Sequence, residues 1–178
     1  MRKVFILTGM PGAGKEEFVK VAQELGYRIV RMGDVVRQEA ERREVAMDDR
    51  GVGGFADSER RLHGPAIWAE RCLAVLGDGD FVIDGSRSLM ELEAFRRSLG
   101  KSARLVAVHT SPDERFRRLQ LRGRRDAPRD RSEFDERDAR ELGWGIGSLI
   151  ALAGTMLVNE GALYDFRTTA RNELERAW

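Results

Sequence analysis

The chain has 178 residues, enough for one domain of ordinary size with its own hydrophobic core. Hydrophobic residues make up 42% of it and charged residues 34%, which is the mixture of a folded globular protein rather than a disordered one. The net charge of +1 argues against a polyanion as the dominant partner, and no apolar run approaches the roughly 20 residues that span a bilayer. The single cysteine, Cys72, cannot form an internal disulfide, so we expect a cytoplasmic protein.

Short apolar runs alternate along the chain with longer segments of helical periodicity. The runs predict five strands, at 4–8, 28–32, 81–84, 104–109 and 156–158. The longer segments predict helices at 15–25, 34–46, 58–76, 89–99, 112–122, 132–142 and 161–176. This alternation is typical of a parallel α/β sheet covered by helices on both faces, so we expect one three-layer domain over 1–178. In such sheets, ligands bind at the carboxyl ends of the strands.

Two segments are irregular. Residues 47–57 are rich in Gly and Asp and predict a mobile loop. Residues 123–131 are charged and contain Pro128, which predicts a hinge into a small helical lid at about 123–147. The glycines at 143, 145 and 147 indicate either a flexible joint or a simple turn between helices.

A glycine-rich segment lies between the first strand and the first helix and matches the pattern G-x-x-x-x-G-K. It consists of Gly9, Met10, Pro11, Gly12, Ala13, Gly14 and Lys15. The glycines let the backbone wrap so that successive N–H groups point at a β-phosphate, and the helix start adds the positive end of its dipole. Lys15 supplies a full charge toward the β- and γ-phosphates. The sequence therefore predicts a nucleoside triphosphate site.

The residue after Lys15 departs from the pattern, because Glu16, followed by Glu17, stands where a Ser or Thr hydroxyl normally ligates magnesium. One alternative is that Glu16 ligates magnesium itself, since this ion favours carboxylate oxygens. A second is that Glu16 repels the triphosphate. A third is that it points away and only favours the start of the helix. The sequence leaves all three open.

Two further motifs lie at the ends of predicted strands, Met32-Gly33-Asp34-Val35-Val36-Arg37 and Asp84-Gly85-Ser86-Arg87. With the phosphate loop, their order resembles the nucleoside monophosphate kinases. The chain resembles most a group of archaeal adenylate-kinase-related or dephospho-CoA-kinase-like P-loop proteins, over nearly its whole length. That likeness extends to His63-Gly64-Pro65, Arg122-Gly123-Arg124, residues 136–143 and Val158-Asn159. It implies a P-loop NTPase fold with a five-stranded parallel sheet in adenylate-kinase-like order and a helical lid.

The resemblance also implies site residues. Asp84, and Glu16 in the first alternative above, would hold magnesium. Glu17 would lie beside the nucleotide, with Asn159 near its base. Residues at about 33–76 would bind the acceptor, with Gly33, Asp34, Arg37 and Arg87 at its phosphate. The competing interpretations are a solvated helix charge for Arg37, a turn-forming aspartate for Asp84 and a turn cap for Asn159.

Arginine is concentrated before and within the expected lid, with eight arginines among residues 115–131. In a kinase lid, Arg122 and Arg124 would lie at the hinge. Arg137 and Arg140, spaced i and i+3 on one helix face, would close over the transferring phosphoryl group. The alternative is a solvated helix laced with salt bridges. Interleaved acids dilute the positive charge of these arginines, which argues against a nucleic-acid partner.

These features lead to a kinase hypothesis. We expect MgATP to donate its γ-phosphoryl group to a phosphorylated small molecule, either a nucleoside monophosphate or dephospho-CoA. The second hypothesis, motivated by Glu16 and Glu17, is a nucleotide-binding regulatory or assembly protein with only slow hydrolysis. The partners expected are thus a nucleoside triphosphate and its acceptor, with no membrane, in a monomer or homodimer.

Overall fold

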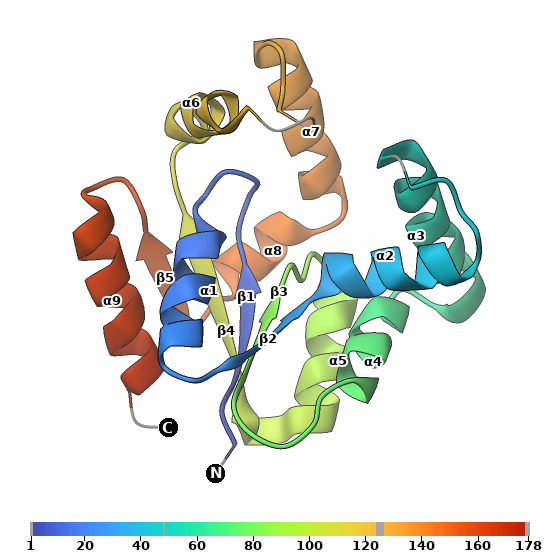
Figure 1. Ribbon diagram of the computed structural model, residues 1–178, viewed down its shortest axis with the longest axis horizontal. Helices are drawn as coiled ribbons and strands as arrows, with labels where there is room; N and C mark the ends of the chain where they lie inside the picture. Colours follow the sequence, from blue (N-terminus) through green and yellow to red (C-terminus); the bar gives the residue numbers. More distant parts are fainter. Residues whose placement is uncertain (1, 48, 124–126, 177–178) are drawn as a thin grey trace.

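The computed structural model describes residues 2–47, 49–123 and 127–176. At its centre lies a parallel sheet with the strand order β2-β3-β1-β4-β5 (Figure 1). The strands are β1 (Val4–Thr8), β2 (Arg28–Arg31), β3 (Phe81–Asp84), β4 (Ala103–His109) and β5 (Thr155–Val158). The five-stranded parallel sheet and the adenylate-kinase-like strand order are therefore confirmed.

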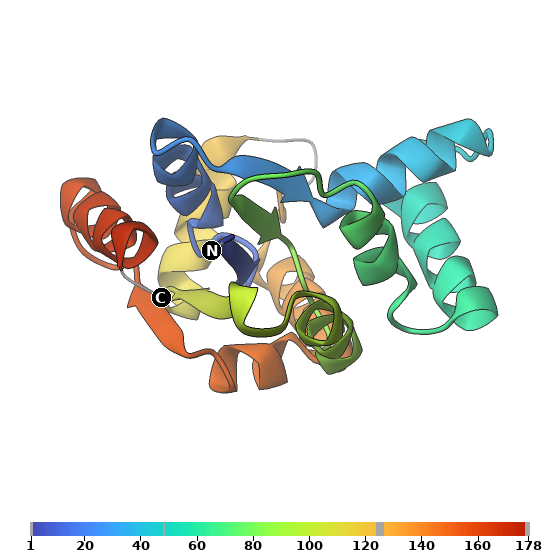
Figure 2. The same ribbon diagram turned by 90° about the horizontal axis from the view of Figure 1, so that it is seen from below.

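Helices cover both faces of this sheet (Figure 2). They are α1 (Lys15–Glu24), α2 (Met32–Arg42), α3 (Asp49–His63), α4 (Ile67–Ala74), α5 (Leu89–Leu99), α6 (Pro112–Arg122), α7 (Arg131–Gly143), α8 (Ile146–Ala151) and α9 (Leu163–Glu175), with a 3-10 turn at Gly100–Ser102. Apolar residues of α1 and α9 form the core on one face, and those of α4, α5 and α8 form the core on the other. Three layers result.

The central strand β1 shows why the sheet is covered twice. Successive side chains of a strand point to opposite faces. Phe5 and Leu7 lie in the core beneath α1 and α9, whereas Val4 and Ile6 lie in the core beneath α4 and α5. All four side chains are fully buried, as the uninterrupted apolar run predicts.

The mobile loop predicted for 47–57 is wrong, because α3 begins at Asp49 and passes through three glycines. Each glycine costs a helix roughly 1 kcal/mol relative to alanine. Tertiary contacts outweigh this cost. Trp68 of α4 is fully buried and donates its Nε1–H to the carbonyl oxygen of Ala56 at 3.2 Å, and its ring meets that of Phe55 edge-on, with centroids 5.9 Å apart.

The single helix predicted for 58–76 is also wrong, since α3 ends at His63 and α4 begins at Ile67. Gly64 between them has a left-handed φ of 100°, which ends a helix at little cost. Pro65 has no N–H to continue the ladder. Helix α8 was not predicted, because its six residues are too few for helical periodicity to show.

Two groups of helices lie beyond the carboxyl ends of the strands. Helices α6 and α7 rise above this edge, and α2 and α3 extend to one side of it (Figures 1 and 2). Arg124, predicted at the lid hinge, lies outside the described residues. The Gly-rich segment after the lid helix forms the short turn between α7 and α8, with Gly145 at φ 101°. In the described part of the chain, no helix is long and apolar enough to cross a membrane.

The contacts of Trp68 predict its effect on stability. We expect Trp68→Ala to lower the free energy of unfolding by about 3–5 kcal/mol, because it leaves a cavity where α3, α4 and the sheet meet. Urea unfolding followed by circular dichroism measures this value. Trp68→Phe keeps most of the ring and should cost clearly less. A loss below about 1 kcal/mol in the alanine variant would contradict the packing described here.

Candidate functional site

The phosphate loop occupies residues 9–14, between β1 and α1, and its conformation requires glycine at two positions. Gly9 and Gly14 have φ values of 143° and 98°. A Cβ at Gly9 would fall well inside contact distance of the Val108 carbonyl oxygen, and one at Gly14 would strike the Asn159 amide. The loop is therefore packed directly against the ends of its neighbouring strands, with no room for a side chain.

Side chains after β4 and β5 hold this loop from behind. Asn159 donates its Nδ2–H to the carbonyl oxygen of Ala13 at 2.9 Å and is 5% exposed. The buried hydroxyl of Thr110 lies 3.0 Å from the same oxygen and 2.9 Å from the carbonyl oxygen of Asn159. Asn159 thus supports the loop directly.

Lys15 folds back onto the loop, donating from Nζ to the carbonyl oxygens of Gly9 at 2.6 Å and Met10 at 3.3 Å. Burial lowers the pKa of this ammonium, and the nearby Asp84 carboxylate partly offsets the effect. Charges on Arg87, Glu141 and Arg137 also act on it. Groups from β3, the following loop and α7 thus surround one lysine.

Asp84 ends β3, opposite Leu7 of β1 in the strand register. Burial raises the pKa of its carboxyl, although the positive charges of Lys15 and Arg31 work against the rise. Its Oδ1 is buried and has no hydrogen-bond partner. A buried carboxylate oxygen left without a partner is costly and calls for an unseen ion or water. Asp84 therefore fits a magnesium ligand.

No group of three or more His, Cys, Asp or Glu side chains within the described residues is arranged to hold a metal. A magnesium ion bound by Asp84 would therefore take most of its remaining ligands from phosphate oxygens and water, which is usual for this ion.

Glu16 is engaged elsewhere. Both of its carboxylate oxygens accept from Nη2 of Arg31, at 2.8 and 3.0 Å. Arg31 ends β2 and lies opposite Asp84 in the strand register. The pair neutralises the charge of Glu16 beside the phosphate loop, so among the described carboxylates the structure favours Asp84 over Glu16 as the metal ligand.

The predicted acceptor residues lie in two places. On α2, Arg37 pairs with Asp34, one turn before it and just after Gly33, and both side chains are about half exposed. An acceptor phosphate would reach Arg37 by replacing Asp34. Arg87, after β3, forms an ion pair with Glu141 of α7, with Nε 2.9 Å from Oε2, and its guanidinium lies 5.4 Å from the centre of the Trp144 ring.

The predicted lid arginines differ in orientation. Arg137 is half-buried and contributes to the lowered pKa of Lys15, whereas Arg140 is exposed. The structure thus brings Arg137 toward the phosphate loop and leaves Arg140 at the surface. The buried positions of α7 are instead Phe134 and Glu141.

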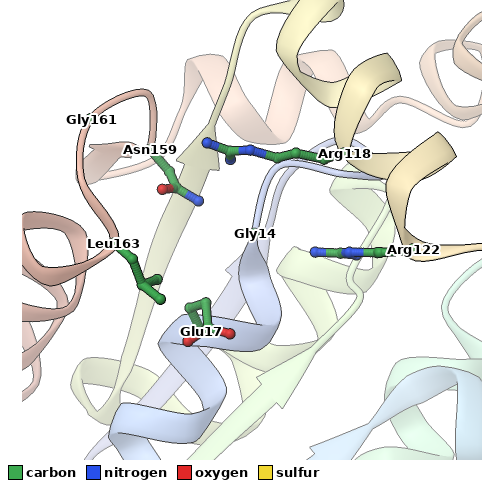
Figure 3. Close-up of a pocket in the computed structure, with 7 residues that line it drawn as sticks. All are labelled: Gly14, Glu17, Arg118, Arg122, Asn159, Gly161 and Leu163. Carbon is green, nitrogen blue, oxygen red and sulfur yellow. The ribbon is translucent and has the colours of Figure 1, made fainter.

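A hollow of about 190 Å³ adjoins the start of α1 (Figure 3). It is lined by Gly14, Glu17, Arg118, Arg122, Asn159, Gly161 and Leu163. Arg118 and Arg122 extend over it from α6. Glu17 pairs with Lys20 at 2.7 Å and with Arg167 at 3.1 Å, and these partners lower the pKa of its carboxyl. This volume is smaller than the roughly 300 Å³ of a pocket for a whole drug-sized ligand and suits one ring system.

Several functional candidates were missed from the sequence. Arg118 precedes the predicted Arg122 by four residues, and this helical spacing could have revealed it. Arg115, Asp138 and Glu141 gave no such signal, because their partners are distant in sequence. Asp138 of α7, for example, accepts two hydrogen bonds from Arg115 of α6.

Comparisons with known proteins agree with this architecture. A family model described as an AAA domain matches residues 8–135. A UPF0200 protein of Thermoplasma acidophilum is 44% identical over 172 residues, which cover 96% of this chain and 94% of that protein.

Solved structures agree on the fold. The protein TT1252 of Thermus thermophilus superimposes with a TM-score of 0.67 at 19% identity, over 97% of this chain and 96% of its own. Shikimate kinase from Bacteroides thetaiotaomicron superimposes with a TM-score of 0.63 at 19% identity, over 98% of this chain and 99% of its own. The fold is therefore that of the P-loop kinases.

Asp84 leads to a prediction for both stability and ligand binding. Since its pKa is raised, the folded state favours the protonated carboxyl, and the ionised form opposes folding. Wild-type stability should therefore fall as pH rises from the ordinary aspartate pKa of 3.8 through the raised pKa. Asp84→Asn has no carboxyl to ionise, so its free energy of unfolding should lack this fall over the same pH range.

The same Asp84→Asn variant should lose the thermal stabilisation that MgATP gives the wild type. Differential scanning fluorimetry, across the pH range above and with and without MgATP, measures both effects. Asp78→Asn, at an exposed position before β3, serves as the matched control and should match the wild type. An Asp84→Asn variant stabilised by MgATP as strongly as the wild type would exclude Asp84 as the metal ligand.

Proposed function

Because the chain belongs to the UPF0200 family and has a P-loop kinase fold, we infer that it is an ATP-binding phosphotransferase. Its donor is MgATP and its acceptor is a nucleoside monophosphate or a similar nucleotide. The observation that carries this proposal is the arrangement beside the phosphate loop of the unpartnered Asp84 carboxylate oxygen at the end of β3 and of the ion pair by which Arg87, after β3, joins Glu141 of α7. A loop that served nucleotide binding alone would need no basic groups arriving from the acceptor side.

Phosphoryl transfer requires little covalent chemistry from the protein, because alignment and neutralisation of charge supply most of the catalysis. Lys15 would meet the β- and γ-phosphates, and Arg137 would approach the transferring group from α7. Magnesium, held by Asp84, would neutralise charge on the β- and γ-phosphate oxygens. The hollow beside Gly14 has the size of a nucleobase and lies where the nucleotide would continue beyond its phosphates.

The acceptor proposal rests on Arg37 and Arg87. Each is a planar fork that now binds a carboxylate, Asp34 and Glu141 respectively. A carboxylate and a phosphate present similar pairs of oxygens to guanidinium, so these contacts mark sites suited to an oxyanion. Two such sites favour an acceptor that carries phosphate. Dephospho-CoA, whose reacting hydroxyl belongs to an adenosine unit, is the second candidate acceptor.

A nucleotide-binding regulatory protein with slow hydrolysis is the alternative from a different class. Its support was the negative charge expected from Glu16 and Glu17 beside the triphosphate. In the structure, Glu16 pairs with Arg31, and Glu17 pairs with Lys20 and Arg167. With these charges compensated, the reason for preferring a degenerate site is weakened.

An acceptor panel tests the proposed function. ADP formation from MgATP is measured with each nucleoside monophosphate, with dephospho-CoA and with water alone. We expect at least one nucleoside monophosphate to raise turnover about 100-fold or more above the water rate, as alignment of two reactants predicts. Activation by dephospho-CoA alone would select the second acceptor. Turnover at the water rate with every acceptor would refute the kinase proposal and leave the regulatory one.

Arg87 should act on the acceptor rather than on ATP. Arg87→Lys replaces a planar fork with a single ammonium, so we expect KM for the acceptor to rise about 10- to 100-fold with KM for ATP changed by less than about threefold. Steady-state kinetics with each substrate varied in turn measures the two constants. Arg117→Lys is the matched control, because Arg117 is an exposed arginine of α6 paired with Glu114. Equal effects on both constants would contradict an acceptor role.

A further inference from the structure

Arg115 of α6 has no part in the function proposed above, yet it is the most deeply buried arginine of the phosphate-loop region. The residue is 3% exposed, and arginine is almost never buried to this extent unless its charge is paired. Its guanidinium donates two hydrogen bonds to the carboxylate of Asp138 on α7, one of them 2.9 Å long. It also lies 4.9 Å from the centre of the Phe134 ring. These contacts fasten α6 to α7.

The same guanidinium reaches the phosphate loop. Nη1 donates to the carbonyl oxygen of Pro11 at 3.1 Å. A Cβ at Gly12 would lie only 3.0 Å from the Arg115 carbonyl oxygen and 3.1 Å from its Cβ, so α6 backs the loop closely at this point. One side chain therefore contacts both the loop that takes phosphate and the helix that carries Arg137.

The geometry of the peptide gives the contact with Pro11 a direction. In a planar trans peptide, the carbonyl group and the following N–H point in opposite directions. By holding the Pro11 oxygen behind the loop, Arg115 turns the Gly12 N–H away from α6 and toward the opposite side of that peptide. The two ends of this peptide are also coupled, since an N–H that donates to an anion makes its own carbonyl a stronger acceptor. Phosphate bound at Gly12 therefore strengthens the hydrogen bond from Arg115.

Asp138 links the strengthened Arg115–Pro11 hydrogen bond to α7. It lies next to Arg137 and one turn before Glu141, and both of these residues act on the charge of Lys15. The Arg115 guanidinium bonds to both Pro11 and Asp138. A stronger bond to Pro11 therefore restricts the movement of Asp138 and of the face of α7 that carries it. Linkage makes the effect reciprocal, so a fixed α7 also favours the loop conformation that binds phosphate.

We propose that Arg115 is a positioning residue that couples occupation of the phosphate loop by a nucleotide to the position of α7 seen here, packed against α6 beside the loop. The proposal rests on the proposed function in one respect, namely that the ligand of the loop is a nucleoside polyphosphate. It does not depend on which acceptor is used.

Arg131 offers a matched comparison for this role. It also joins α7 to α6, through an ion pair with Asp113 at 2.6 Å and through the rings of Phe116 and Phe134 at 5.8 and 5.1 Å. These contacts lie on α6 and α7 alone, and its side chain is 47% exposed. Removing Arg131 loosens the helix pair without touching the phosphate loop.

Hydrogen exchange of the α7 backbone amides, with and without MgADP, tests the coupling in the full chain. In the wild type and in Arg131→Met, we expect MgADP to slow exchange in α7 about fivefold or more, which is the lower end of typical coupling between sites. In Arg115→Met, this slowing should shrink to less than about twofold, while protection of the loop and α1 by MgADP remains. Asp138→Asn should act in the same direction with a milder effect on folding, because it keeps the contact of Arg115 with Pro11.

Four results would overturn the proposal. The first is that MgADP slows hydrogen exchange in α7 as strongly in both Arg115→Met and Asp138→Asn as in the wild type. The second is that Arg131→Met loses this slowing as fully as Arg115→Met, which would mean that Arg115 only joins two helices. A third is protection of the wild-type loop by MgADP with no change in α7. The fourth is failure of MgADP to bind the wild type, which would also end the proposed function. Normal coupling without transfer to any acceptor would refute the kinase alone.

Discussion

A buried ammonium needs negative partners close by, and Lys15 finds them in the carbonyl oxygens of Gly9 and Met10 and in the carboxylate of Asp84. This requirement shapes the surrounding structure. The left-handed glycines of the loop allow its carbonyls to turn toward Nζ, and the pairing of β3 with β1 brings Asp84 near enough for its charge to act on Lys15. The cost of burying the charge is thus met by the sheet order and by the loop conformation together.

Further charged residues around Lys15 and Asp84 are also compensated by ion pairs. Arg31, at the end of β2, acts on Asp84 and binds Glu16, and Glu141 of α7 binds Arg87. Each of these ion pairs joins two different elements, α1 with β2 and the loop after β3 with α7. The pairs therefore position β2, the loop after β3 and α7 around one centre. The partly exposed members add little to overall stability, so their main physical effect is on geometry.

The limits of sequence-based prediction follow from the same distinction between local and distant interactions. All five strands were located within one residue, because a buried parallel strand is a local apolar run. The position of the glycine-rich loop between β1 and α1 and that of Asp84 at the end of β3 were also predicted, since a glycine pattern and a strand end are local features. The first part of the helix at Asp49–His63 was missed, because its glycines oppose a helix and tertiary contacts such as the packing of Trp68 stabilise it. Arg115 was missed for a similar reason, as its burial depends on Pro11 and Asp138, which lie on either side of it in the chain and far from it.

Glu16 shows how a departure from a motif can be resolved by its neighbours. A carboxylate beside the phosphate-binding lysine would repel a triphosphate if its charge were unpaired, and the sequence gives no partner for it. The partner, Arg31, is supplied by the strand register, which places the end of β2 against the end of β3. The same guanidinium lowers the pKa of Asp84, whereas Glu16 raises it. Glu16 and Asp84 therefore share one cation. If Asp84 holds magnesium as proposed, any group that draws Arg31 away from Glu16 would change the charge that Asp84 presents to the metal. The residue after the lysine would then affect the proposed metal site without being a ligand of it.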